Sequence, residues 1–337
     1  QEKSPVDDDT IREGATRDHL YKIVDRMVPH CGELITLWAY HAYRDVFTPD
    51  ILRSFISGQG TSDDARRRHI PMFWRWQEDD IRAALAFTEE NGRWDTSGVT
   101  MTATPSGDGY ELNGIKSFVL DGHTAERIIV LARQPGTAGD AGLSLFSVAA
   151  DAAGLERRLL QSTDATRKLA RLEFKAVTGT LLGEAGGAAA PLAKTLDQAV
   201  ACLANEMVGG AEALREQALD YAQMRMQFGR TIASFQTMKH KSADMLIEVE
   251  MAKSAAYYAA AAADDDDGAF PAVASLAKAG ASEAYMQTAI HAIQIHGGIG
   301  FTWDNDTQLW FKRAKSSQVF LGDANYHREL MVQRWQD

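Results

Sequence analysis

The sequence has few cysteines, no long apolar run and a shortage of positive charge, and each shortage excludes a class of protein. Cys31 and Cys202 form neither a CxxC pair nor a zinc spacing, which argues against a disulfide framework and favours a reducing cytoplasm. No apolar stretch reaches the roughly 18 residues that cross a bilayer, so we expect no membrane span. The net charge of −11 argues against nucleic acid as a partner, but it leaves room for a phosphate-bearing small molecule.

What is present suffices for a sizeable globular protein. The chain has 337 residues, of which 45% are hydrophobic, enough for two or three domains. It shows no signal peptide, and because it begins at Gln1 rather than Met, we expect it to be trimmed or incomplete. The aspartate run 264–267 predicts a solvated turn rather than a metal site, because nothing around it supplies a cage.

The hydrophobic pattern changes twice along the chain, which predicts a three-part α+β organisation. Residues 1–85 carry apolar residues at three- and four-residue spacing and predict a short helical domain. Residues 86–183 show short alternating runs and predict a β-domain. Residues 192–337 predict a helical bundle, with long helices over about 234–263 and 271–296 and an earlier one whose apolar stripe runs from Leu196 to Tyr221.

Within the β-domain, the clearest local signal is Asn113-Gly114. This pair is typical of a type I′ turn, so we expect a hairpin between strands at 110–112 and 115–119. Residues 128–132 and 143–148 are apolar enough for buried strands, and Arg171–Phe174 alternates in a way that could close the sheet.

Two motifs in the helical part carry chemistry. The first is Arg225-Met226-Gln227-Phe228-Gly229-Arg230, followed by Phe235-Gln236. An arginine here could simply neutralise a helix C-terminus, but its planar donors also fit the oxygens of a diphosphate. The second is Gln294-Ile295-His296-Gly297-Gly298-Ile299-Gly300, in which glycines end a helix and permit close backbone approach by a ligand.

Taken together, these motifs resemble the flavin-binding segments of the acyl-CoA dehydrogenase family, over about residues 84–335. The resemblance implies that family's fold, with an N-terminal helical domain, a middle β-domain and a C-terminal four-helix bundle, and it implies FAD as the cofactor. In the family, the arm carrying Arg225, Phe228 and Gln236 reaches a neighbouring subunit's FAD.

The resemblance implies further contacts for the rest of the flavin. Gln294, Gly297 and Gly298 would line its ribose and diphosphate. Phe87-Thr88-Glu89-Glu90 resembles a strand end whose threonine contacts the isoalloxazine ring, and Phe118 matches an aromatic residue that packs on it. The plain alternative is two core strands, and Asn91–Asp95 departs from the family's pattern at this point.

The base is where the chain departs most from the family. Oxidation of an acyl-CoA needs a carboxylate near the α-carbon as general base. The family places it either before a glycine in the loop preceding the last helix, where this chain has Leu321, or at the position of Ala199. Glu206 lies seven residues after Ala199 on nearly the same helical face, at the edge of the apolar stripe, and is a candidate substitute if it is partly buried. It could equally be a helix-surface glutamate or a member of an interface ion pair. Asp323 is a weaker one.

Several interpretations stay open. Segments Arg167–Ala170 and Phe311–Ser317 resemble subunits of actinobacterial heteromeric enzymes that desaturate steroid side-chain CoA thioesters. In that case a homologous subunit supplies the base in an α2β2 assembly, with an acyl-CoA substrate and an electron-transferring flavoprotein as acceptor. The alternatives are a homo-oligomeric dehydrogenase with Glu206 as base, a flavin-dependent monooxygenase on the same fold, and a subunit retained only for assembly.

Overall fold

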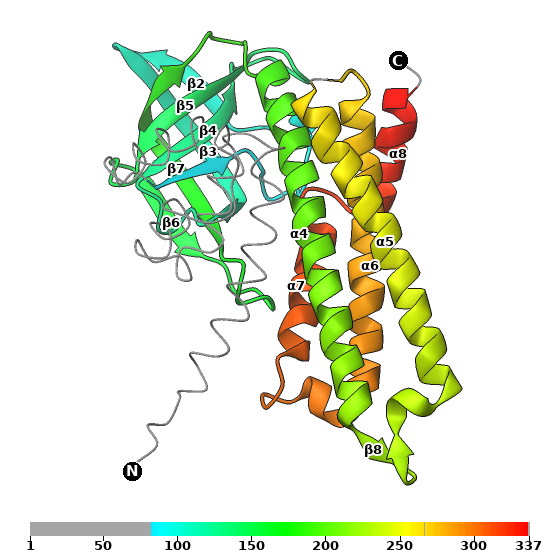
Figure 1. The fold of residues 1–337 in the computed structure, drawn as a ribbon. Coiled ribbons are helices and arrows are strands. Elements are labelled where there is room, and N and C mark those ends of the chain that lie inside the picture. Colours follow the sequence, from blue (N-terminus) through cyan, green and yellow to red (C-terminus); the bar gives the residue numbers. More distant parts are fainter. Residues whose placement is uncertain (1–81, 266, 336–337) are drawn as a thin grey trace, which may run out of the picture. The chain divides into compact units, whose positions relative to one another are not determined.

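The structure is a computed structural model that describes residues 82–265 and 267–335 (Figure 1). The described chain divides into two compact units, residues 82–196 and residues 197–335. The helical domain expected over residues 1–85 lies almost entirely outside the described residues. A mixed β-sheet and a set of long helices confirm the α+β class.

Seven strands form the sheet within residues 82–196, and five of them close into a ring. The strands are β1 (Ala83–Ala86), β2 (Thr102–Ser106), β3 (Gly109–Leu120), β4 (Arg127–Arg133), β5 (Leu143–Ala149), β6 (Leu155–Leu159) and β7 (Leu169–Leu182), with a short helix η1 (Thr96–Gly98) between β1 and β2. The order β4-β2-β3-β7-β5 closes because β5 also pairs with β4, whereas β1 and β6 flank β4 and β7. The strands predicted at 128–132, 143–148 and 171–174 are confirmed.

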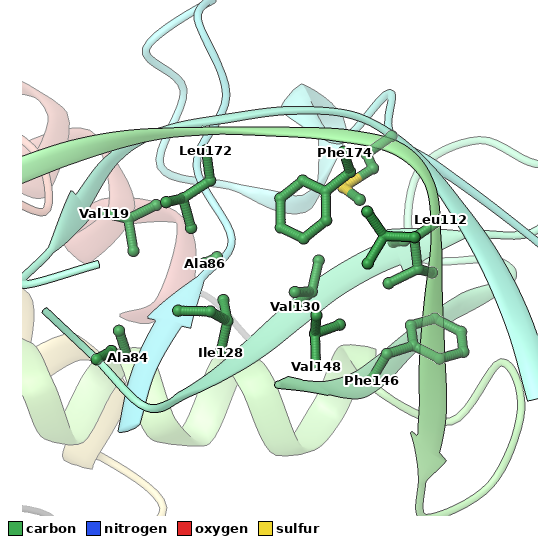
Figure 2. Packing of buried hydrophobic residues seen from close by; sticks show 14 of the residues in the cluster. Ala84, Ala86, Leu112, Val119, Ile128, Val130, Phe146, Val148, Leu172 and Phe174 are labelled. Atoms are coloured by element: carbon green, nitrogen blue, oxygen red, sulfur yellow. The ribbon is translucent and has the colours of Figure 1, made fainter. Parts of the chain in front are cut away.

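The ring is filled by side chains that alternate along each strand, as a pleated strand requires. Figure 2 shows Leu112, Val119, Leu172 and Phe174 of β3 and β7 facing side chains from β1, β4 and β5 across this core. The labelled side chains on the other side are Ala84, Ala86, Ile128, Val130, Phe146 and Val148. All are at most 6% exposed, so the inward positions of the strands are buried on the ring's inner face.

The hairpin predicted at Asn113-Gly114 is wrong. These residues lie inside the continuous strand β3, at a register shift against β7, and the hairpin turn falls instead between β2 and β3. Gly114 has φ 148°, and a Cβ there would lie 2.8 Å from Met101 Cγ. Asn113 Oδ1 accepts a hydrogen bond from the Ala176 amide at 2.8 Å. The pair therefore serves a β-bulge that tertiary contacts hold, and the local turn preference is overridden.

Five helices dominate residues 197–335 (Figure 1). They are α4 (Ala189–Met224), α5 (Gln236–Asp264), α6 (Phe270–His296), α7 (Thr307–Val319) and α8 (Ala324–Trp335), joined by β8 (Met226–Gln227), β9 (Arg230–Thr231), η2 (Ile232–Ser234) and η3 (Gly297–Phe301). The predicted long helices are confirmed. The stripe on α4 is buried, as Val200, Leu203, Met207 and Leu214 show. In the part of the chain that the structure describes, no helix combines the length and apolar character needed to cross a membrane.

Candidate functional site

A short hairpin projects from the end of α4 and presents Phe228 to solvent. Arg225 follows α4, and its carbonyl accepts a hydrogen bond from the Ile232 amide at 2.8 Å, which closes the base of the β8–β9 hairpin. Phe228 and Gly229 form the tip with φ of 53° and 76°, a conformation that only glycine adopts without strain. Phe228 is 91% exposed. A large apolar side chain held out in a strained turn is a feature of a contact surface rather than of a core.

The hairpin is braced at the start of α5. The Arg230 guanidinium lies 4.0 Å from the centroid of the Phe235 ring, and Phe228 meets the same ring edge-on at 6.2 Å. Phe235 directly precedes α5, so the cation–π contact ties the hairpin to that helix. The sequence motif included Arg230 but did not reveal this bracing role, because it depends on a ring five residues away.

The end of α6 packs beside the end of α4. His296 is buried and stacks on Tyr221, with ring centroids 4.4 Å apart, and its Nδ1 donates to the Ala292 carbonyl at 2.8 Å. His296 is thus a packing residue that joins the two helices. Gly297 then ends α6 with φ 67°. A Cβ at either Gly297 or Gly298 would meet no atom of the described residues within 4 Å, so on this side the backbone is open to a ligand.

Six predicted cofactor residues gather at the end of the bundle where β8 lies (Figure 1). All six are exposed: Arg225, Phe228, Gln236, Gln294, Gly297 and Gly298. They offer a guanidinium, two carboxamides and an open glycine backbone, which are donors that suit phosphate oxygens and sugar hydroxyls. The residues present therefore fit the diphosphate and ribose of a dinucleotide such as FAD.

The two ring-side candidates, Thr88 and Phe118, lie in the β unit. Thr88 is buried, and its Oγ1 donates to the Ser117 carbonyl at 2.5 Å, while the Ser117 amide donates back to the Thr88 carbonyl at 3.0 Å. Phe118 follows with φ 60° at a register shift between β3 and β7, and 37% of it remains exposed. The segment after β1 is therefore locked to β3 next to an aromatic residue in a strained conformation.

Sequence reasoning missed a buried ion pair that supports this lock. Lys116 Nζ lies 2.8 Å from Glu89 Oε1 and donates to the Phe87 carbonyl at 3.3 Å. Glu89 also accepts from the backbone amides of Thr100 and Met101. Burial lowers the pKa of Lys116 to about 8 although Glu89 opposes the shift. Burial alone would raise the pKa of Glu89, but the Lys116 charge and these hydrogen bonds hold it below its usual value.

Four positions were considered for the general base, and two of them carry a carboxylate. Leu321 is buried with φ 60° in the loop between α7 and α8, and Ala199 is half-buried on α4, so neither offers an ionisable group. Glu206 is buried, and its Oε1 accepts from Arg313 Nε at 2.9 Å and lies 2.8 Å from a second guanidinium nitrogen. Asp323 accepts from the Tyr326 amide at 2.8 Å and so caps α8.

Comparisons with known proteins agree with this geometry. Residues 84–177 match the model of the acyl-CoA dehydrogenase middle domain, and residues 185–336 match that of the acyl-CoA dehydrogenase C-terminal domain. The chain is 32% identical to cyclohexane-1-carbonyl-CoA dehydrogenase of Geobacter metallireducens, over 83% of this chain and 74% of that protein. It is 37% identical to acyl-CoA dehydrogenase IpdE2 of Mycobacterium tuberculosis, over 51% and 50% respectively.

A solved structure shows the same relationship. Butyryl-CoA dehydrogenase of Megasphaera elsdenii superposes with a TM-score of 0.74 at 27% identity, covering 82% of this chain and 73% of that one. The chain spans about two thirds to three quarters of the length of the curated relatives that match most of it. Two family models that together cover most of the chain, and a relative 32% identical, establish its kinship. The chain belongs to the acyl-CoA dehydrogenase family, and its cofactor is FAD.

Proposed function

We propose that this chain is one subunit of a heteromeric FAD-dependent acyl-CoA dehydrogenase, in which a homologous subunit supplies the general base. The observation that carries the proposal is a contrast inside the helical unit. The corner with Arg225 and Gln294 is exposed and rich in donors, whereas the two usual base positions hold Leu321 and Ala199, which cannot accept a proton.

In this proposal the chain's own residues bind and orient the cofactor. Arg225 and Gln294 hold the diphosphate and ribose, and Gly297 and Gly298 allow close backbone approach. Phe228 and Gln236 extend the contact to a flavin that sits largely on the partner. Thr88 and Phe118 are the candidates in the β unit for contact with an isoalloxazine ring. Bound FAD would supply the acceptor for the hydride that leaves the β-carbon of the acyl thioester, and the partner's carboxylate would take the α-proton.

A homo-oligomeric enzyme with Glu206 as base is the second candidate, because Glu206 is a buried carboxylate on the helix that carries Ala199. The Arg313 ion pair speaks against it, since that contact must be broken or neutralised before Glu206 takes up a proton. Substitution Glu206→Gln decides between them. Loss of α-proton exchange with FAD still bound would support Glu206 as base, and unchanged exchange would exclude it.

The proposal also covers partners and substrate. The resemblance of segments Arg167–Ala170 and Phe311–Ser317 to actinobacterial subunits supports a steroid side-chain CoA thioester as substrate and an α2β2 assembly. The 37% identity to a mycobacterial relative over half of the chain adds to that support. An electron-transferring flavoprotein is the proposed acceptor.

The test is to purify the full-length protein alone and together with a homologous subunit encoded beside it. Mass of the assembly, FAD per subunit and acyl-CoA dehydrogenation are then measured. We expect little activity alone and restored activity in a mixed tetramer. Full activity of the isolated protein would overturn the proposal. Substrate hydroxylation driven by reduced flavin and oxygen would point to a monooxygenase, and a flavin-free assembly would indicate a role in assembly only.

A further inference from the structure

Lys241, His291 and Gln294 form a polar cluster that joins the start of α5 to the end of α6. The Lys241 ammonium lies 3.0 Å from Gln294 Oε1 and 3.3 Å from His291 Nδ1. Neither Lys241 nor His291 belongs to the motifs that indicated a flavin site. The proposed function above does not use them.

The chemistry of an ammonium group determines how both neighbours are oriented. It has three donors and no acceptor, so Gln294 must turn its carbonyl oxygen toward it and His291 must present an unprotonated Nδ1. His291 therefore carries its proton on Nε2 and is neutral. Burial, and then the nearby Lys241 charge, lower the pKa of His291, while Asp244 opposes the shift. The cluster thus keeps one positive charge, and the NH2 group of Gln294 points away from Lys241.

The outward side of this cluster is open. Gln294 is exposed and lies one turn before Gly297 and Gly298, where a Cβ would meet no atom within 4 Å. The last turn of α4 packs on the same corner through the contact between Tyr221 and His296. An exposed glutamine would otherwise sample several rotamers and both amide orientations, so fixing it lowers the entropic cost of binding.

We propose that Lys241 is a positioning residue of the flavin site: it orients the Gln294 amide so that its N–H donors face the diphosphate and ribose of FAD, and it adds a positive charge beside them. This inference rests on the proposed function, since it concerns the same corner and the same ligand.

The experiment is a FAD titration of the apoprotein, in its assembly with the partner subunit, for Lys241→Met and Lys241→Arg. We expect Lys241→Met to weaken FAD binding by about 10- to 100-fold and to lower its salt dependence. Lys241→Arg, which retains charge and donors, should stay within about threefold of the wild type. Lys239→Met removes the same charge two residues earlier from an exposed side chain and should change FAD binding less than about twofold.

Two further readouts separate positioning from a general structural effect. Binding of riboflavin, which lacks diphosphate and adenosine, should be unchanged in Lys241→Met. In a Gln294→Ala background the Lys241→Met change should weaken FAD binding by a clearly smaller factor than in the wild type, because only the charge effect remains. Equal weakening of FAD and riboflavin, or full additivity with Gln294→Ala, would overturn the inference. If Lys241→Met does not fold, Lys241→Arg decides: FAD binding as weak as in Gln294→Ala would overturn the inference.

Arg225→Met separates this inference from the proposed function. If both Lys241→Met and Arg225→Met leave FAD binding unchanged, the proposed site itself is wrong. If Lys241→Met leaves FAD binding unchanged and Arg225→Met weakens it, this inference alone fails.

Discussion

Two corners of the helical unit share unusual backbone geometry but differ in everything else. The first is the glycine corner, formed by Gln294, Gly297 and Gly298 at the end of α6. Gly297 has φ 67°, and all three residues are exposed and offer hydrogen-bond donors. At the loop between α7 and α8, Leu321 and Gly322 have φ of 60° and 104°, and both are buried. The glycine corner is a surface that can receive a ligand. The second corner, the loop 320–323, is tightly packed and is called the joint below.

The joint is held by two buried side chains that cap its carbonyls. Lys278, which is fully buried, donates to the carbonyls of Ser317, Gln318 and Gly322 at 3.1, 3.3 and 2.9 Å. His327 Nε2 donates to the Leu321 carbonyl at 2.9 Å. The joint thus keeps a demanding loop conformation around a leucine. The contrast teaches that a loop can keep a demanding backbone conformation without an ionisable side chain, because loop shape and side-chain chemistry are set by different contacts.

The largest effect is expected from Gly322→Ala at the joint. A Cβ there would lie 2.3 Å from Tyr326 Cδ1 at a φ that L-residues avoid, so we expect a loss of about 3 kcal/mol in the free energy of unfolding, measured in urea. Gly183→Ala is the control, because its φ of 72° imposes strain where nothing lies within 4 Å, and it should cost about 1 kcal/mol. Equal losses for both variants would show that the joint is not tightly packed.

A second effect at the joint depends on pH. Burial, and then the Lys278 charge, lower the pKa of His327 from 6.5 to about 4. The unfolded chain therefore binds a proton between these values that the folded chain does not, so stability is lost as the pH falls from about 6.5 to 4. We expect about 2–3 kcal/mol of that loss to disappear in His327→Gln, which keeps a donor for Leu321 but does not titrate. Identical pH profiles for the wild type and His327→Gln would contradict this assignment.

The two corners also differ in how far the sequence predicted them. The apolar stripe on α4, the long helices and the helix end at Gly297 follow from local sequence patterns, which is why they were predicted and found. Lys241 lies 53 residues from Gln294, and Lys278 lies 44 residues from Gly322, so no local pattern could reveal either contact. The turn predicted at Asn113-Gly114 was wrong for the same reason, since Asn113 pairs with the Ala176 amide, 63 residues away.

Glu206 shows the same limit at a single residue. Its place at the edge of the apolar stripe left both burial and exposure open, and the structure buries it. Its partner Arg313 is 107 residues away in the sequence. The ion pair with Arg313 matters more than burial for a role as base, because it must be broken before Glu206 can take up a proton. Periodicity predicts which face is buried, but it does not predict which charges meet there.

At the glycine corner, Arg225→Met tests the ligand surface directly. Arg225 is exposed, so its loss should leave the free energy of unfolding within about 0.5 kcal/mol. Removing charge-assisted hydrogen bonds to a diphosphate should weaken FAD binding by about 30-fold, or about 2 kcal/mol. Arg328→Met, at an exposed arginine on α8, is the control and should bind FAD as the wild type does. Unaltered FAD affinity in Arg225→Met would contradict the proposal that this corner binds the diphosphate of FAD.

The smallest change, Gly298→Ala, completes the comparison with Gly322→Ala. A Cβ at Gly298 would meet no atom within 4 Å, and the residue lies in the short helix η3, so alanine should leave stability unchanged or raise it by a few tenths of a kcal/mol. Among the described residues nothing would contact the added methyl group, so a change in FAD affinity would report contact with the ligand. A drop in FAD affinity of about tenfold without loss of stability, read from titration and urea unfolding, would place the cofactor on the glycine backbone. Unchanged affinity would mean that FAD approaches this corner through side chains alone.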